Sequence, residues 1–247
     1  LARRFPEAAS KGHDGTSTEG ASNIPSSFEH ALVTYAVVNP AVAVGCWRSV
    51  GSSQNAFITE CFFDELTAQT GGDPLAARLQ LLEGHPRHAG VLQLAAEKAD
   101  WSKPAPAGRA RGIAVAEAFG SWAAQVAEVS IENNQVRVHH ITCAVDCGMI
   151  VNPDTIRAQM ESAIVYGLTA CLKGEITLAG GQVEQDNFDT YPLLSIDECP
   201  EISIYIVDST QPPGGIGEPG VPPVAPAVAN AVFALTGKPV RSLPIRL

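Results

Sequence analysis

Residues 112–145, with the sequence GIAVAEAFGSWAAQVAEVSIENNQVRVHHITCAV, decide the fold class. Their small and β-branched apolar residues predict strands over 112–118, 123–132 and 135–145. Asn133 and Asn134 separate the last two strands, and Asn tolerates the left-handed backbone that a tight hairpin turn needs. The segment therefore predicts consecutive strands, the last two joined as a hairpin.

Helical patterns precede these strands. Residues 54–69 place four apolar side chains on one helical face, and Gly71-Gly72 ends the pattern. The four are Phe57, Cys61, Phe62 and Leu66. Asp73 followed by Pro74 predicts the start of a short helix that continues to Leu82, because Asp caps helices and Pro suits the first helical position. A third helix is expected over 89–99.

Helices and strands are mixed after the hairpin. Asn152-Pro153-Asp154 opens an amphipathic helix with an apolar face. That face consists of Ile156, Met160, Ile164 and Leu168. Residues 175–178 and 202–207 are expected to be strands, and 222–235 an apolar helix stopped by Gly237.

These elements predict an α+β chain in two parts. Residues 1–104 form a helical part with a polar N-terminal tract, and residues 105–247 form a strand-rich part. The Pro-rich stretch 102–108 has the composition of a linker between them.

Composition excludes some function classes. The chain has 247 residues, 45% of them hydrophobic and 17% charged, which is typical of a globular protein with a sizeable core. No apolar run reaches the roughly 18 residues of a membrane span. The net charge of −10 argues against nucleic acid as a partner. Arg3-Arg4 precedes a polar stretch and does not form an export signal, so the sequence leaves the compartment open, cytoplasmic or periplasmic.

The six cysteines do not form a metal motif. No pair has C-x-x-C spacing. His139, His140, Cys143 and Cys147 lie along an expected strand, on which residues four apart are separated by about 13 Å, too far to share one metal. Buried thiols are therefore expected, and no metal-ligating residue is assigned in this chain.

The turn 212–220, PPGGIGEPG, holds a single carboxylate, that of Glu218. Three preceding glycines lack Cβ atoms, so a bulky ligand could approach the backbone, while the flanking prolines restrict it. Such a turn could present a general base to a cofactor. Composition alone favours the alternative, a surface connection with a solvated acid.

Several segments match one family in the correct order. They are 144–153 (AVDCGMIVNP), 157–161 (RAQME), 214–223, 46–57 (CWRSVGSSQNAF) and 112–115 (GIAV). From about Glu19 to Leu247 the chain resembles the large subunit of the molybdenum hydroxylases, the xanthine dehydrogenase and aldehyde oxidase enzymes, and most of all the branch formed by the beta subunits of bacterial isoquinoline 1-oxidoreductases. We expect the C-terminal portion of such a large subunit, with a partial molybdenum-cofactor-binding domain.

The resemblance implies site residues. Glu218 matches the family's catalytic base, which takes a proton so that water-derived oxygen can attack an electron-poor carbon. The residues matched to cofactor binding are Arg48, Ser49, Gln54, Gln159, Gly215 and Gly217. Without the resemblance, the pattern favours an interface aromatic beside a surface cation for Trp47-Arg48, and an ordinary polar-face residue for Gln159.

The resemblance also implies cofactors and partners. The cofactor would be molybdenum-molybdopterin, in the cytosine dinucleotide form, and the substrates aldehydes or N-heteroaromatic compounds. Electrons would leave through [2Fe-2S] clusters on a separate small subunit, and the remainder of the large subunit would be a further partner. The alternative is a noncatalytic remnant or interaction module that keeps the fold.

Two positions depart from the family pattern. Ser162-Ala163 stands where the branch usually has two glycines, which adds side chains at a close-packed point. Val50 stands where xanthine dehydrogenases carry an aromatic residue that stacks on the substrate, which argues against purine specificity.

Overall fold

A four-stranded sheet organises the chain in the computed structural model, which describes residues 15–25, 28, 30–36, 38, 42 and 45–247. The strand order is β1-β2-β3-β6. The strands are β1 (Arg109–Ala118), β2 (Ser121–Glu132), β3 (Gln135–Asp146) and β6 (Glu201–Ile206). The polar N-terminal tract lies partly, and Arg3-Arg4 wholly, outside the described residues.

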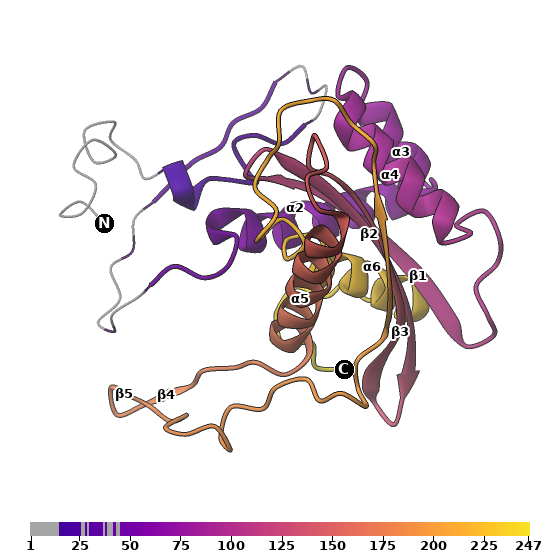
Figure 1. The fold of residues 1–247 in the computed structure, drawn as a ribbon. Coiled ribbons are helices and arrows are strands. Elements are labelled where there is room, and N and C mark those ends of the chain that lie inside the picture. The colour runs from indigo at the N-terminus through magenta and orange to yellow at the C-terminus, as the bar shows by residue number, and fades with distance from the viewer. Residues whose placement is uncertain (1–14, 26–27, 29, 37, 39–41, 43–44) are drawn as a thin grey trace.

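The predicted hairpin is confirmed. β2 and β3 pair antiparallel, and Asn133 and Asn134 between them have φ values of 51° and 62°, the left-handed conformation expected for this turn. β6 pairs parallel to β3, so the chain must cross over between them. That crossover contains α5 (Pro153–Leu172) and an excursion with the two-residue strands β4 (Leu178–Ala179) and β5 (Gln182–Val183), which projects from the body (Figure 1).

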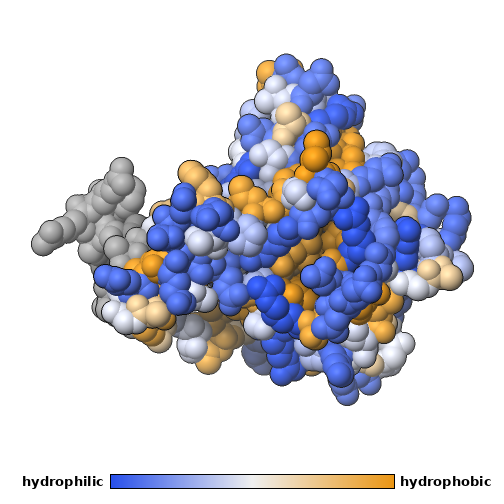
Figure 2. All heavy atoms as spheres, turned by 90° about the horizontal axis from the view of Figure 1, so that it is seen from below, coloured by the Kyte–Doolittle hydropathy of each residue, from blue (hydrophilic) through white to orange (hydrophobic). Residues whose placement is uncertain are grey.

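Helices cover both faces of the sheet (Figure 1). On one face α4 (Pro86–Lys98) packs through Val91, Leu92 and Ala95. On the other face α5 and α6 (Val224–Thr236) share a core with the strands. Figure 2 shows the molecule from below. Most of this face is hydrophilic, and hydrophobic residues are visible between the hydrophilic areas. No helix of the described residues combines the length and apolarity needed to cross a membrane.

Three of the predicted helix boundaries are confirmed by their capping groups. Asp73 accepts a hydrogen bond of 2.8 Å from the Ala76 N–H at the start of α3 (Pro74–Leu81). Asn152 Oδ1 accepts bonds of 3.0 Å from the Asp154 and Thr155 N–H groups at the start of α5. Gly237 ends α6 with a φ of 67°.

The apolar face predicted for the first helix is wrong in part. α2 (Val50–Gln69) begins four residues earlier than expected, and Phe62 and Leu66 are 54% and 50% exposed. The helix turns polar side chains inward instead, because the buried Arg78 of α3 forms ion pairs with Asp64 and Glu60. Packing of charged groups from a neighbouring helix, rather than the apolar pattern, sets the orientation of α2.

A second correction concerns residues 175–178. Only Leu178 of this predicted strand belongs to β4, and β4 pairs solely with β5. Because the excursion lies away from the sheet, residues 175–177 have no neighbouring strand with which to form a ladder. The division into two parts at residue 104 stays a prediction, although α4 from the first part packs directly on strands of the second.

A short 3-10 helix before α2 and the connection between α4 and β1 belong to the same body. The 3-10 helix η1 (Gly15–Ser17) precedes α2 and contacts it through Asn55, whose Nδ2 donates to the Ser17 and Glu19 carbonyl oxygens at 3.1 and 2.7 Å. Residues 99–108 form the connection between α4 and β1, where a linker was expected.

Candidate functional site

The loop that carries Glu218 is seated against the turn between β1 and β2. The Gly215 N–H donates to the Phe119 carbonyl oxygen at 2.8 Å. A Cβ atom on Gly214 would lie 2.2 Å from the Gly120 carbonyl oxygen, and one on Gly215 would lie 2.9 Å from Phe119 Cβ. Two of the three glycines are therefore needed for close packing inside the protein. Only Gly217 has open space where a side chain would be.

Arg48 joins three separate segments at this loop. Its Nε donates to the Gly217 carbonyl oxygen at 2.9 Å, and its Nη2 donates to the same oxygen. Its guanidinium also donates to Gln159 Oε1 at 3.3 Å and to Ser162 Oγ at 3.2 Å, both on α5. One side chain at the start of α2 thus fixes the loop relative to α5. Ser162, which departs from the family pattern, supplies an acceptor here.

Ser49 holds Glu218 itself. The Ser49 N–H donates to Glu218 Oε2 at 2.8 Å, and the Ser49 hydroxyl donates to the Glu218 carbonyl oxygen at 2.7 Å. Ser49 is completely buried and is the N-cap residue of α2, yet its hydroxyl does not cap the helix. The carboxylate therefore lies at a helix N-terminus, where the helix dipole favours negative charge.

The backbone at the start of α2 is strained. Ser49 and Val50 have φ values of 67° and 44°, although neither residue is glycine. Left-handed conformations cost energy for residues with a Cβ atom, above all for β-branched ones, and such strain gathers at functional sites. Here the strained residues aim the Ser49 N–H at the Glu218 carboxylate.

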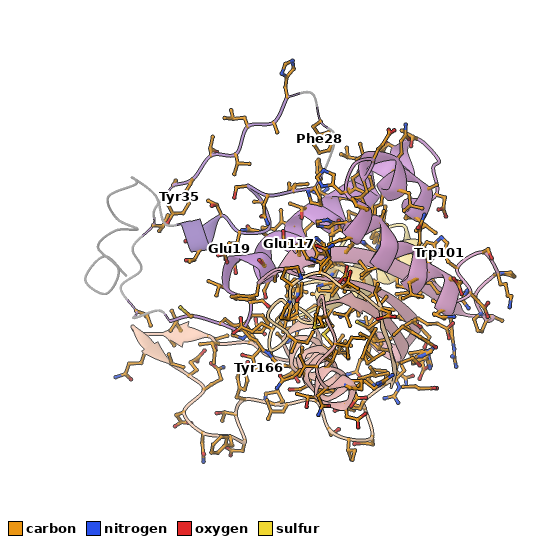
Figure 3. All side chains as sticks on the ribbon, turned by 45° about the horizontal axis from the view of Figure 1, so that its top comes forward. Glu19, Phe28, Tyr35, Trp101, Glu117 and Tyr166 are labelled. Carbon is orange, nitrogen blue, oxygen red and sulfur yellow. The ribbon has the colours of Figure 1, made fainter. Side chains whose placement is uncertain are left out.

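Aromatic rings border the cluster. The Trp47 and Tyr166 rings are 4.9 Å apart, and Arg48 Cζ lies 5.7 Å from the centre of the Tyr166 ring. Tyr166 projects from α5 and is labelled in Figure 3. Desolvation raises the pKa of the Tyr166 hydroxyl above its ordinary value. The Tyr166 ring thus faces one side of the Arg48 guanidinium.

Gln125 also supports the loop, and sequence reasoning missed it. It is fully buried in β2, and its Nε2 donates to the Gly220 carbonyl oxygen at 2.8 Å. A lone amide in the apolar run 123–127 was the available signal, because a buried polar side chain needs a partner. Gly220 in turn leaves room for Ala163, since a Cβ atom on Gly220 would lie 2.8 Å from the Ala163 Cβ.

Not every predicted residue joins the cluster. Arg48, Ser49, Gln159, Gly217 and Glu218 are brought together, and Gly215 lies in the same loop. Gln54 is exposed on α2, and among the described residues no hydrogen bond links it to the cluster. Its part in cofactor binding stays a prediction.

The cysteines and histidines of β3 have structural surroundings. Cys143 of β3, Cys147 just after it and Cys171 of α5 are buried, and desolvation raises the pKa of the Cys143 and Cys171 thiols to about 12. His139 and His140 contact Ser130 and Ser203. Within the described part of the chain, no three His, Cys, Asp or Glu side chains gather in a way that could hold a metal ion.

Comparison with known proteins identifies the family. A family model described as a molybdopterin cofactor-binding domain matches residues 87–200. The chain is 35% identical to the isoquinoline 1-oxidoreductase beta subunit of Brevundimonas diminuta, over 81% of this chain and 26% of that protein. The chain belongs to the molybdenum hydroxylase family. Gln159 lies inside the matched domain, and Arg48, Ser49 and Glu218 lie outside it.

A second curated relative and a solved structure are also similar to this chain. The chain is 32% identical to a nicotinate dehydrogenase subunit of Pseudomonas putida, over 90% of this chain and 20% of that protein. The solved aldehyde oxidoreductase of Desulfovibrio desulfuricans ATCC 27774 covers 81% of this chain and 40% of its own, with a TM-score of 0.66 and 13% identity. That likeness confirms the predicted α+β fold. The chain spans only 26% and 20% of the length of the two curated relatives named here.

Proposed function

We propose that the chain is the C-terminal portion of a molybdopterin-dependent oxidoreductase that hydroxylates aldehydes or N-heteroaromatic compounds with oxygen from water. One observation carries the proposal. Arg48 and Ser49 meet Gly217 and Glu218 across 169 residues of sequence, and Arg48 also reaches Gln159, 111 residues away. The names of two relatives, an isoquinoline oxidoreductase and a nicotinate dehydrogenase, support an N-heteroaromatic substrate class.

The residues present fit a polar cofactor. Gly217 borders open space, and in the described part of the chain the Gln159 amide NH2 and Glu218 Oε1 have no hydrogen-bond partner. Arg48, Ser49, Gln159, Gly215 and Gly217 would hold the molybdopterin, with Gln54 as a further contact. When bound, the molybdenum cofactor supplies a two-electron redox centre and the water-derived oxygen.

Glu218 acts as the general base. Ser49 binds Oε2 and the main-chain carbonyl of Glu218, which fixes the carboxylate and leaves Oε1 as the oxygen that accepts the proton. Arg48 holds the preceding carbonyl group, and Gln125 holds the carbonyl group of Gly220. The base is thus anchored on both sides before the cofactor and substrate arrive, which lowers the cost of orienting it.

The electrons from the reaction need a path out of the site. We assign it to [2Fe-2S] clusters on a separate small subunit, since the cysteines of this chain lack the spacing of an iron-sulfur motif. The two relatives named above are themselves called subunits. The pterin is assigned the cytosine dinucleotide form, as the bacterial branch of the resemblance implies.

A noncatalytic remnant is the rival hypothesis. The joint presence of Arg48, Gln159 and Glu218 in one hydrogen-bonded arrangement argues against it, since a lost site would have no reason to keep all three. Molybdenum analysis of the protein purified with its native partners separates the two. A complex without molybdenum would support the remnant.

Isotope labelling tests the reaction. The complete enzyme is turned over in H2¹⁸O with an aldehyde and with an N-heteroaromatic compound, and the products are examined by mass spectrometry. The proposal expects one ¹⁸O atom in the hydroxylated product, taken from water. A product that carries oxygen from O2, or no hydroxylated product with either class, would contradict it.

A further inference from the structure

A buried ion pair lies at the end of β3, apart from the hydrogen bonds that hold Glu218. Asp146, the last residue of β3, is 5% exposed. Its carboxylate accepts a hydrogen bond of 2.7 Å from Arg87 Nε and one of 2.5 Å from Arg87 Nη2. Arg87 belongs to the first turn of α4. Two parallel bonds between a guanidinium and a carboxylate fix both side chains, so the pair ties α4 to the end of an inner strand of the sheet.

Trp122 of β2 gives the same arginine a second contact. Trp122 lies opposite Asp146 in the ladder between β2 and β3, and Arg87 Cζ lies 3.6 Å from the centre of the Trp122 ring. A guanidinium at this distance from an indole ring gains a cation–π attraction. Arg87 is therefore placed by two neighbouring strands, and it meets the carboxylate of Asp146 in one fixed orientation.

Asp146 uses the same carboxylate to fix the turn that follows β3. Its Oδ1 also accepts a hydrogen bond of 2.9 Å from the Gly148 N–H. Gly148 has a φ of 74°, and a Cβ atom there would lie 2.2 Å from the Pro212 carbonyl oxygen. Although burial acts to raise the pKa of Asp146, the hydrogen bonds from Arg87 and Gly148 hold it below its ordinary value. The fold thus stabilises a charged carboxylate at this turn.

The turn after β3 carries the start of the loop that leads to Glu218. The Met149 N–H donates to the Gln211 carbonyl oxygen at 2.9 Å. The Gly214 N–H donates to the Cys147 carbonyl oxygen at 2.8 Å. The first residues of the loop therefore follow the backbone that Asp146 fixes, and Glu218 comes four residues after the second of these bonds.

We propose that Asp146 is a positioning residue for Glu218, an inference that rests on the proposed function of Glu218 as the base. The ion pair with Arg87 holds the Asp146 carboxylate, the carboxylate holds the Gly148 N–H, and the turn holds the beginning of the loop. Asp146 thereby acts on the reaction only through the place where it puts the Glu218 carboxylate.

The supports described above act further along the loop. The contacts of Arg48, Ser49 and Gln125 are all made at Gly217 or beyond it. The turn after β3 holds residues 211–214 instead, so the loop is held at both ends. Loss of either end would let the carboxylate shift, and a misplacement of about 1 Å can lower a catalysed rate about 10²-fold.

A double-substitution cycle in the complete enzyme tests the proposal. Asp146→Asn removes the charge and keeps the size of the side chain, and it is made alone and together with Glu218→Gln. The limiting rate of the reductive half-reaction per bound molybdenum and the dissociation constant of the substrate are measured. We expect Asp146→Asn alone to lower the rate about 10- to 100-fold and to change the dissociation constant by less than about twofold, because it displaces the base and not the substrate.

The second half of the cycle shows whether Asp146 acts through the base. In the Glu218→Gln background, Asp146→Asn should change the rate by less than about twofold, since no base is left to position. Asp208→Asn is the matched control, because Asp208 is exposed in the connection between β6 and the same loop. The control should keep the rate within about twofold of wild type.

The other outcomes overturn the proposal. An equal loss with and without the Glu218 carboxylate would show that Asp146 supports the fold or the cofactor independently of the base, and an unchanged rate in Asp146→Asn would show no role. Arg87→Gln breaks the same ion pair from α4 and should repeat the pattern, and if neither variant folds, the role of the pair is structural. If Glu218→Gln alone retains more than about a tenth of the wild-type rate, the proposed function itself fails and this inference fails with it.

Discussion

α2 and α5 each have 20 residues and each contribute to the cluster around Glu218, but they are held in opposite ways. α5 buries Ile156, Met160, Ile164 and Leu168 in the main core. α2 turns Asp64 inward to an ion-paired arginine and leaves Phe62 outside. A helix can therefore be held in the fold by apolar packing or by buried charge from a neighbouring helix, and the second way leaves large apolar side chains exposed.

The largest expected loss of stability comes from breaking the ion pairs that hold α2. Arg78→Met leaves the buried Asp64 and the partly buried Glu60 without their partner, and removing one member of a buried ion pair typically costs about 3–5 kcal/mol. Urea unfolding of the 247-residue chain measures the loss. Arg78→Lys, which keeps the charge, serves as the control and should lose less. Unchanged stability in Arg78→Met would show that α2 is not held by this network.

A cavity in the apolar packing of α5 should also lower the stability of the chain. Met160→Ala in α5 removes a fully buried side chain and is expected to cost about 2–5 kcal/mol. The same unfolding experiment applies, with Glu161→Ala as a control because Glu161 is exposed on the next position of α5. A loss below about 1 kcal/mol for Met160→Ala would mean that α5 contributes little to the core.

A smaller effect is expected at the junction of α2 with the loop. Ser49→Ala removes the hydroxyl that bonds the Glu218 carbonyl, a loss of about 0.5–1.5 kcal/mol. Ser49→Gly loses the same bond but relieves the left-handed backbone, so it should be the less destabilised of the two. If both variants lose equally, the φ of 67° does not strain the chain.

The smallest loss of stability is expected for an exposed apolar residue of α2, in contrast to the buried apolar residues of α5. Phe62→Ala should change the unfolding free energy of the 247-residue chain by no more than about 0.5 kcal/mol, because the side chain is already 54% exposed. Urea unfolding of the 247-residue chain measures the difference. A loss above about 1 kcal/mol would show that Phe62 contributes to the packing of α2.

The sequence predicted the structural elements that depend on residues close together in the chain. The strands 112–145, the Asn133-Asn134 turn and the α5 face follow from patterns a few residues long, and the structure confirms them. The orientation of α2 could not be predicted in this way, because it depends on Arg78 of another helix. The short strand at 178 failed for a similar reason, since a strand needs a neighbour that local sequence does not specify.

In the candidate site, too, single residues could be predicted from the sequence, whereas contacts between distant segments could not. Arg48, Ser49, Gln159 and Glu218 were selected one by one from the family resemblance, but their hydrogen bonds span 111 to 169 residues and appear only in the fold. Gln125 lies in no matched motif, so its bond to Gly220 was missed. Gly214 and Gly215 also pack closely on the β1–β2 turn, a contact between distant segments that local sequence does not specify.

The central claim is that Glu218 is a general base held in place by Ser49, and the Glu218→Gln variant of the complete enzyme tests it most directly. Gln keeps the size of the side chain and an oxygen for the Ser49 N–H, so folding and molybdenum content should be preserved. The measured quantity is the rate of the reductive half-reaction per bound molybdenum. The account predicts a loss of about 10²- to 10⁴-fold, the usual contribution of a general base. A variant that retains more than about a tenth of the wild-type rate would contradict it, because that loss is smaller than general-base catalysis is worth.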